Sequence, residues 1–298
     1  MGRRRAHRIA VVVPVTGSRA LWGQLLQNAI ARASSSSPPD APAARWIVHD
    51  EAALTGPIPI GGPDSTGLTD DSYSAVFGHL DPGLLDSTLP HYAAADLPCF
   101  LPFTHPEHRP RPDLVLGWSS SPRAQAELLV KLLRSVGART VLLLRDSSTY
   151  GGRLAQLLNE ALPELSEIRD AGGAQERVVS DAVVLCALYH RAAESAEALR
   201  AAGYRGHLIL PWDCSIGEVF SPPGLSHGSH LVRPVGGAKA WAELAALALH
   251  KAALTLRAGA TGTEWVAAVR KASSVPLDPQ GRPVAETWQL LKLDGSAR

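Results

Sequence analysis

The chain has 298 residues, of which 45% are hydrophobic and 19% are charged, and its formal net charge is +1. This composition is typical of a globular chain with one or two domains and excludes a disordered one. The near-neutral charge excludes the strong basic field of a nucleic-acid-binding protein. The three cysteines are far apart, without metal or disulfide spacing, and Cys99 and Cys186 stand in apolar runs that predict buried thiols.

The N-terminal segment superficially resembles an export signal, because Arg3–Arg5 precede the apolar run Ile9–Val13. The run stops at Pro14 and no small-residue cleavage site precedes it, so we interpret it as a buried strand. The sequence therefore predicts a cytoplasmic protein, or a periplasmic or extracellular one if an export signal has been removed. The apolar stretch Ala238–Leu256 contains several charged residues, which excludes membrane insertion.

Short apolar strands alternate with helices along the first half of the chain. Ile9–Val13 is typical of a parallel strand covered on both faces. A helix follows, with Ser18 as its expected N-cap and apolar residues at helical spacing from Leu21 to Ala33. Further elements are expected as strands at 46–50, 74–78, 98–101 and 114–117 and as a helix from about 83 to 95. Residues 56–71 show no helical period where a parallel βαβ unit normally needs a helix.

A pattern of helix, glycine, strand and aspartate occurs twice in the second half. Helices ending at Gly137 and Gly203 precede strands 140–144 and 207–210, and Asp146 and Asp213 follow those strands. The chain between the expected strands at Ile168 and Val183 is again too short for a full crossover helix. After these, a strand is expected at 231–235 and a helix at 238–256. A capping box at Thr261 and Glu264 predicts the start of a helix that ends near 272. A type I turn at 278–281 and a strand at 286–293 complete the chain.

No catalytic, metal or cofactor motif has the context that its chemistry requires. Gly224–Gly228 matches the G-x-S-x-G nucleophile elbow, but prolines precede it and a strand-like run follows it. A serine esterase at Ser226 is therefore only a minor alternative. His227 and His230 have half of a metal-ligand spacing and no third ligand nearby. We expect no enzyme activity, no metal and no cofactor.

A second set of residues indicates recognition of a small ligand. In Asp146–Gly152 a strand turns into a helix that begins with Tyr150, and ligands of open α/β sheets bind at such places. Together, these side chains would suit an α-amino acid, with donors for its carboxylate, a carboxylate for its ammonium and an aromatic wall: Trp22, Thr104, Tyr150, Tyr189 and Asp213. Each also has a structural interpretation, as a core residue for Trp22, a turn cap for Thr104, a packing residue for Tyr189 and a helix N-cap for Asp213.

The order of these elements resembles the type I periplasmic-binding fold, and is most similar to the branched-chain amino-acid binding proteins of ABC importers. The resembling segments are Ile9–Ala31, Gly78–Leu80, Leu101–Glu107, Asp146–Leu154, Leu185–Gly203 and Leu277–Gly281. The resemblance implies two Rossmann-like βα lobes joined by three crossings, here with shortened crossovers in both lobes. It places residues 8–117 and 235–275 in the N-terminal lobe, and residues 118–234 and 276–298 in the C-terminal lobe.

The same resemblance implies a role for each candidate residue. Thr104 matches the hydroxyl of the family's crossing loop, Tyr150 and Tyr189 match two pocket tyrosines, and Trp22 matches a pocket aromatic. Asp213 matches the family's ammonium-binding glutamate, unless Trp212 aligns there instead. Asp81-Pro82-Gly83 stand where the family has carboxylate-binding serines. Asp81 would repel a ligand carboxylate unless it points away or caps the helix.

The resemblance implies a non-catalytic protein that holds an amino-acid-like or other small polar ligand in the cleft between two lobes and closes by hinge motion. Such a receptor would deliver its ligand to a membrane permease. The alternative is a cytosolic sensor or regulatory domain with a lost or altered ligand, acting with a fused or associated regulatory protein. The absence of a visible export signal, Asp81 and the shortened crossovers motivate this alternative.

Overall fold

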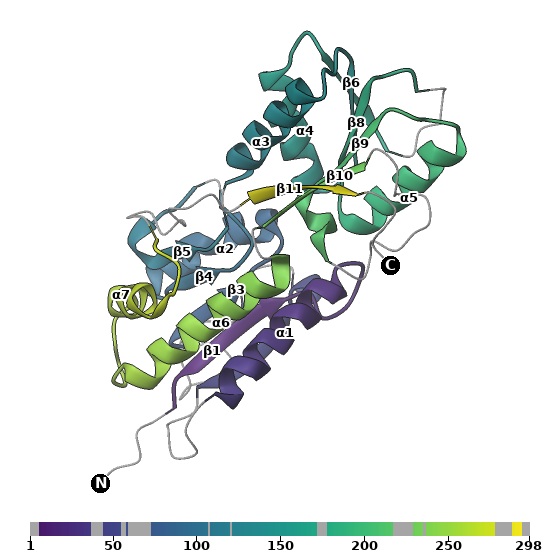
Figure 1. The fold of residues 1–298 in the computed structure, drawn as a ribbon. Helices are drawn as coiled ribbons and strands as arrows, with labels where there is room; N and C mark the ends of the chain where they lie inside the picture. Colours follow the sequence, from purple (N-terminus) through teal and green to yellow (C-terminus); the bar gives the residue numbers. More distant parts are fainter. Residues whose placement is uncertain are drawn as a thin grey trace. The chain divides into compact units, whose positions relative to one another are not determined.

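The chain forms two compact α/β units in a computed structural model (Figure 1). The structure describes residues 6–36, 44–54, 58, 73–106, 108–119, 121–171, 178–216, 229–234, 237–277 and 288–293. The first unit combines Met1–Ser119 with Lys239–Ala285, and the second combines Ser120–Ala238 with Glu286–Arg298, so the chain crosses between them three times. The two-lobed fold class expected from the sequence is confirmed. The lobe boundaries given above stay a prediction.

The sheet of the first unit is parallel throughout, with the strand order β2-β1-β3-β4-β5. Its strands are β1 (Arg8–Val13), β2 (Arg45–Asp50), β3 (Ala75–Gly78), β4 (Cys99–Leu101) and β5 (Val115–Gly117). All five are close to the apolar runs predicted from the sequence. The run at β1 is apolar throughout because helices cover both faces of a parallel sheet.

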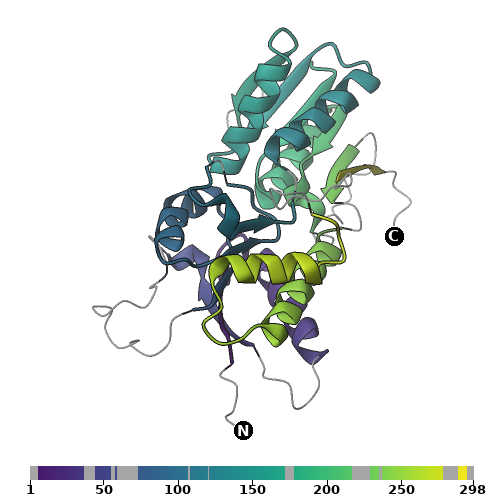
Figure 2. The same cartoon turned by 90° about the vertical axis from the view of Figure 1, so that its left-hand side faces the viewer.

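Four helices belong to the first unit: α1 (Ala20–Ser35), α2 (Pro82–Ala94), α6 (Gly237–Thr255) and α7 (Gly262–Ala272). Ala10 and Val12 point to one face of the sheet, where they share a hydrophobic core with Leu85 and Leu89 of α2. Helices α1 and α6 lie side by side and are joined by an ion pair (Figure 1). Figure 2 shows that α6 and α7, although late in the sequence, return to the unit that the first strands build.

The second unit has the sheet order β11-β10-β9-β8-β6-β7, in which only β11 is antiparallel to its neighbour. The strands are β6 (Val141–Arg145), β7 (Ser166–Asp170), β8 (Ala182–Cys186), β9 (His207–Leu210), β10 (Ser229–Pro234) and β11 (Trp288–Leu293). The helices are α3 (Pro122–Ser135), α4 (Thr149–Ala161) and α5 (Tyr189–Ala201). Helices α3 and α4 cover one face of this sheet and α5 covers the other (Figure 1).

The alternation of side chains along each strand of the second unit divides its core between the two faces of the sheet. Leu143 of β6 and Val184 of β8 pack under α3 and α4. Their neighbours Leu142 and Leu185 pack under α5. Both faces are therefore apolar, which explains why these strands read as continuous hydrophobic runs rather than alternating ones.

Several local predictions can be compared with the observed element ends. The capping box of Thr261 and Glu264 is confirmed at the start of α7. Gly137 and Gly203 adopt φ values of 71° and 87° just after α3 and α5, as expected of glycines that end helices. The Ser18 N-cap is wrong, because α1 begins at Ala20 after a turn in which the Ala20 amide donates to the Gly17 carbonyl.

The predicted short crossovers fall partly outside the described residues. In the second unit, the described residues between β7 and β8 contain no helix. In the first unit, a three-residue 3₁₀ turn, Glu51–Ala53, follows β2. The predicted helix-free stretch 56–71 lies outside the described residues except for Ile58. The type I turn at 278–281 also lies outside them.

Two broader expectations concern the membrane and the cysteines. None of the helices that the structure describes is both long and apolar enough to cross a bilayer. Cys99 and Cys186 are buried free thiols, as predicted, and Cys214 is buried too. Burial raises the pKa of all three thiols, so they remain protonated and behave as small apolar side chains.

The two sheets share one topological feature, a reversal in the direction in which successive strands are added. In each, the chain starts at an inner strand, moves one strand to one side, and then crosses to the other side. The resulting switch points lie between β1 and β3 in the first unit and between β6 and β8 in the second. Ligands of open α/β sheets bind beyond the carboxyl ends of the strands at such switch points. These two carboxyl-end edges are therefore where the candidate residues should be sought.

Candidate functional site

The carboxyl-end edge of the second unit is held together by the Asp146 carboxylate. Asp146 directly follows β6, and its Oδ2 accepts a 2.9 Å hydrogen bond from the amide of Leu188, which follows β8. Its Oδ1 accepts from the amide and the hydroxyl of Ser148. One carboxylate thus ties together the loops on both sides of the switch point, so the side chains that follow these strands are fixed relative to each other.

Tyr150 lies in the first turn of α4, two residues after the N-cap residue Ser148. The Ser148 hydroxyl accepts a 3.0 Å hydrogen bond from the Gly151 amide and so satisfies one free donor of the helix. The Tyr150 hydroxyl accepts a 3.2 Å hydrogen bond from Nε2 of Gln125 on α3. The rings of Tyr150 and Trp212 meet edge to face, with centroids 6.4 Å apart.

Asp213 lies beyond β9 in the 3₁₀ turn Trp212–Ser215, and its residue is only 1% exposed. It does not cap this turn, whose N-cap residue is Pro211. Instead, Asp213 Oδ2 accepts a 2.8 Å hydrogen bond from the amide of Tyr189, the first residue of α5. The carboxylate of Asp213 therefore stabilises the positive end of a different helix.

The electrostatics show that Asp213 also acts on Tyr150. Burial first, and then the nearby Asp213 charge, raise the pKa of the Tyr150 hydroxyl well above its ordinary value. Tyr150 consequently keeps its proton at neutral pH and remains a hydrogen-bond donor. Three of the predicted residues, Tyr150, Tyr189 and Asp213, are thus brought together on one edge of one unit. We refer to these three residues and Trp212 as the second-unit cluster.

The packing of Gly151 and Gly152 at the head of α4 leads to a stability prediction. A Cβ on Gly151 would lie 2.2 Å from the Cys186 carbonyl oxygen and 2.3 Å from Asp146 Oδ1, whereas a Cβ on Gly152 would meet nothing within 4 Å. We expect Gly151→Ala to lower the free energy of unfolding by about 2 kcal/mol, since backbone must move to make room. Gly152→Ala should raise it by about 0.5 kcal/mol through helix propensity. Urea denaturation of both variants measures this, and equal effects would contradict the described geometry.

The carboxyl-end edge of the first unit is centred on Glu51, a residue that the sequence interpretation missed. Its Oε1 accepts hydrogen bonds from the amides of Leu80 and Asp81, at 3.0 and 3.1 Å. The same oxygen lies 3.0 Å from Nδ1 of His79, whose Nε2 is 2.8 Å from the Tyr92 hydroxyl. His79, Leu80 and Tyr92 are buried, whereas Asp81 is exposed. A single carboxylate therefore fixes the loop between β3 and α2.

Asp81 and Thr104 are placed at this edge, and each has an internal partner. Asp81 Oδ1 accepts a 2.8 Å hydrogen bond from the Leu84 amide, so it caps α2 rather than projecting freely. The Thr104 hydroxyl donates to the carbonyl oxygen of His79. The proposed carboxylate-binding role of Thr104 stays a prediction, and the structure gives this hydroxyl an internal acceptor.

Trp22 is fully buried in the first unit, where its ring meets that of Phe103 edge to face with centroids 5.0 Å apart. This packing favours the interpretation of Trp22 as a core residue over that of a pocket wall. Phe103 precedes Thr104, so the predicted residues Trp22, Thr104 and Asp81 do lie in one neighbourhood. The prediction that the ligand lies between the two lobes remains a prediction.

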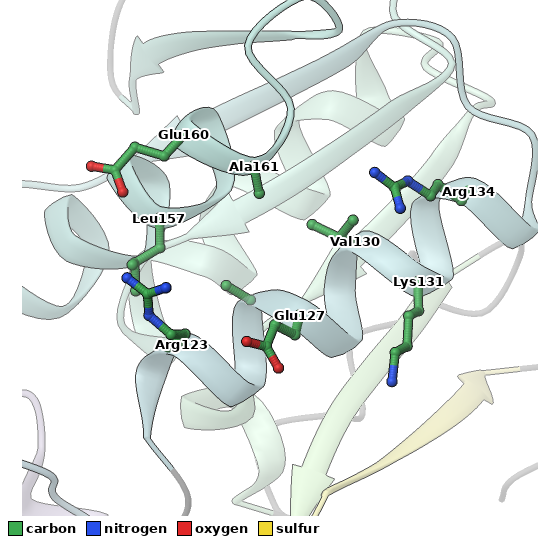
Figure 3. A pocket seen from close by; sticks show the side chains of 9 residues that line it. Arg123, Glu127, Val130, Lys131, Arg134, Leu157, Glu160 and Ala161 are labelled. Atoms are coloured by element: carbon green, nitrogen blue, oxygen red, sulfur yellow. The ribbon is translucent and has the colours of Figure 1, made fainter.

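A surface cavity of about 470 Å³ lies elsewhere in the second unit, between α3 and α4 (Figure 3). Side chains of Arg123, Glu127 and Lys131 reach it from α3, and Glu160 reaches it from α4. Charges of both signs at three- and four-residue spacing are typical of a solvated helix surface. The cavity contains none of the predicted site residues, so we do not regard it as the recognition site.

The remaining chemical alternatives concern metals and Ser226. Among the residues that the structure describes, no group of three or more His, Cys, Asp or Glu side chains is arranged to hold a metal ion. Ser226 and His227 lie outside the described residues, so the esterase alternative is untested. His230 lies in β10 beside His207, at a ring-centroid distance of 5.6 Å, away from the carboxyl-end edge.

Comparison with solved structures identifies the fold. The chain is similar to a leucine-binding protein, LivK, from Thermotoga maritima (TM-score 0.73, 14% identity, 97% of this chain and 96% of that one). It is also similar to LivJ, the branched-chain amino-acid transporter substrate-binding protein of Streptococcus pneumoniae, in complex with isoleucine. The TM-score is 0.72 and the identity is 15% over 97% of each chain. The chain is also similar to an extracellular ligand-binding receptor from Rhodopseudomonas palustris, with a TM-score of 0.76 and 15% identity over 98% of each chain.

At these identities the similarity is one of fold, and it covers nearly the whole length of the chain. No protein-family model and no curated protein sequence matches the chain. The chain therefore has the type I periplasmic-binding fold that the sequence resemblance implied.

Proposed function

We propose that this chain, with its type I periplasmic-binding fold, is a non-catalytic receptor for a small polar ligand that carries an amine. The observation that supports this best is the second-unit cluster at the switch point between β6 and β8. It combines a buried carboxylate, Asp213, with the hydroxyl of Tyr150 and the ring of Trp212. A protonated amine is the group that such a set recognises, through the carboxylate and the aromatic face.

The ligand would be amino-acid-like, by analogy with the solved proteins named above, two of which are described as binding leucine or isoleucine. Of the two biological roles, delivery to a membrane permease follows the same analogy. The sensor alternative is supported by the first-unit edge, where Asp81-Pro82-Gly83 stand in the place of the family's serines. The loop amides there donate to the carboxylates of Glu51 and Asp81. A ligand other than a standard amino acid would suit either role.

Isothermal titration calorimetry with a panel of free amino acids and their amides tests this proposal. A correctly folded sample should bind at least one panel member at one site per chain and return it chemically unchanged. Absence of heat with every member, or chemical consumption of a member, would contradict the proposal. Transport and sensing are distinguished by neighbouring genes: permease and ATPase genes favour transport, whereas a fused or adjacent regulator favours sensing.

A further inference from the structure

Resting on the proposed function, we infer that Gln125 is a positioning residue of the site. It fixes the Tyr150 hydroxyl as a hydrogen-bond donor toward the ligand, so the ligand carries an acceptor atom near its amine. The chemical class is an amine with a neighbouring carbonyl, carboxylate or hydroxyl oxygen, and a plain alkylamine falls outside it. All residues that carry the inference belong to the second unit.

The first step concerns where Gln125 is held. Gln125 lies one turn into α3, where its backbone amide donates to the carbonyl of the N-cap residue Ser121 at 3.2 Å. The next residue, Ala126, shares a core with Leu154 of α4, so the two helices are fixed against each other. Gln125 is only 1% exposed. Burying a side-chain amide is costly unless it is hydrogen-bonded, so Gln125 needs the partner that it has in Tyr150.

The second step concerns the direction of the Tyr150 proton. Gln125 Nε2 donates to the Tyr150 hydroxyl oxygen at 3.2 Å. A phenol has one proton, and that proton cannot lie on the line that the N–H of Gln125 already occupies. Burial first, and then the Asp213 charge, raise the pKa of Tyr150 well above its ordinary value, so the proton stays on the oxygen at neutral pH. The proton therefore points away from Gln125.

The third step concerns what receives this proton. Among the residues that the structure describes, none accepts a hydrogen bond from the Tyr150 hydroxyl. Tyr150 is only partly buried, and its ring meets that of Trp212 within the second-unit cluster, where the ligand is proposed to bind. A buried donor without an acceptor costs more than a typical hydrogen bond contributes. A ligand that covers this hydroxyl therefore has to supply the acceptor.

The fourth step excludes the amine itself as the acceptor. An ammonium group has three donors and no acceptor, so it cannot receive the Tyr150 proton. The group of the cluster that suits an ammonium is the Asp213 carboxylate. The ligand thus needs two neighbouring groups, an ammonium for Asp213 and an acceptor oxygen for Tyr150. Attraction to Asp213 alone would not distinguish a plain alkylamine from an amino acid, its amide or an amino alcohol.

Matched ligands test the chemical class on the full chain. Three sets, based on alanine, leucine and phenylalanine, each contain the amino acid, its amide, the corresponding amino alcohol and the amine that lacks any oxygen. Calorimetry at about pH 6 keeps the amino groups protonated. We expect the best oxygen-bearing member to bind about tenfold tighter than the plain amine of its set. Equal or tighter binding of the plain amine would overturn this inference and leave the proposed function intact, whereas no binding in any set would overturn both.

The role of Gln125 is tested with Gln125→Met, which has a similar length and no amide donor. Without that donor the hydroxyl can turn a lone pair toward the ammonium, so we expect the preference for the oxygen-bearing ligand over the plain amine to fall about fivefold. The matched control is Gln156→Met, at an exposed glutamine of α4 that donates to Glu160, and it should leave the preference unchanged. A merely structural role would weaken both ligands alike. An unchanged preference in a Gln125→Met protein that is folded by circular dichroism would overturn the inference.

Tyr150→Phe completes a double-substitution cycle, and it tests the inference even if Gln125→Met does not fold. It removes the hydroxyl without changing Gln125, so by itself it should abolish the preference for the oxygen-bearing ligand. Adding Gln125→Met to this variant should change the preference no further, because the hydroxyl through which Gln125 acts is then absent. A preference that persists in Tyr150→Phe, or that falls again in the double variant, would contradict the assigned role of Gln125.

Discussion

Replacing Asp213 with asparagine is expected to weaken ligand binding at least tenfold, which corresponds to a loss of about 1.4 kcal/mol or more. The substitution removes the buried negative charge to which the proposed function assigns the ligand's ammonium group, while an amide oxygen remains to accept the Tyr189 hydrogen bond. Hydrogen bonds to charged groups contribute about 1.5–3 kcal/mol and neutral ones about 0.5–1.5 kcal/mol, so loss of the charge alone can account for a change of this size. Calorimetry with whichever panel member binds the unmodified protein measures the change.

A matched control for this prediction is Asp170→Asn in the same unit. Asp170 pairs with Arg145 at 2.7 Å, but its side chain is 77% exposed, so its charge is screened by water. This variant should bind as the unmodified protein does. Asp213→Ala should weaken binding further, because it also leaves the first amide of α5 without its acceptor. Unchanged affinity in both Asp213 variants would remove this residue from the site.

Replacing Glu51 with alanine is expected to lower the free energy of unfolding of the first unit by about 3 kcal/mol. The change would strand the amides of Leu80 and Asp81 and the imidazole of His79, all of which now share one carboxylate. Buried donors that lose their acceptor cost far more than the hydrogen bond gained on folding. The urea-denaturation midpoint, followed by tryptophan fluorescence, gives the measurement.

Two further variants show whether the loss comes from these contacts. Glu51→Gln keeps an acceptor and should recover more than half of the stability. Asp113→Ala removes an exposed acid from the same unit and should change stability by less than about 0.5 kcal/mol. If Glu51→Ala were as stable as Asp113→Ala, the Glu51 carboxylate would not hold the loop between β3 and α2 as described.

Much of the fold could be predicted from the sequence because its signals are local. An apolar run of five residues such as Ile9–Val13 predicts a covered parallel strand, and glycines such as Gly137 end helices through their own backbone freedom. The start of α1 was predicted incorrectly because Ser18 has a favourable side chain for an N-cap, but the turn at Gly17 moves the helix start to Ala20. Helix and N-cap propensities alone do not predict that turn.

The candidate site shows where local reasoning ends. Tyr150, Tyr189 and Asp213 could be selected because each follows a strand that the sequence makes visible. The partner of Asp213 could not be predicted, since the Tyr189 amide is 24 residues away in the sequence. The two groups meet because β8 and β9 are neighbouring strands in the sheet. Glu51 was missed for the same reason, because its partners are 28 to 30 residues distant. The available signal was two consecutive acids at the end of the predicted strand 46–50, with Asp50 as its last residue and Glu51 directly after it.

The most direct test of ligand recognition without catalysis is equilibrium dialysis of the full chain against an equimolar mixture of the twenty amino acids, their amides and simple alkylamines. Mass spectrometry then quantifies each compound on both sides of the membrane. The proposed function predicts that one amine-bearing compound is enriched on the protein side, up to one per chain, and that its total amount is unchanged. No enrichment of any compound, or loss of a compound to a product, would contradict it.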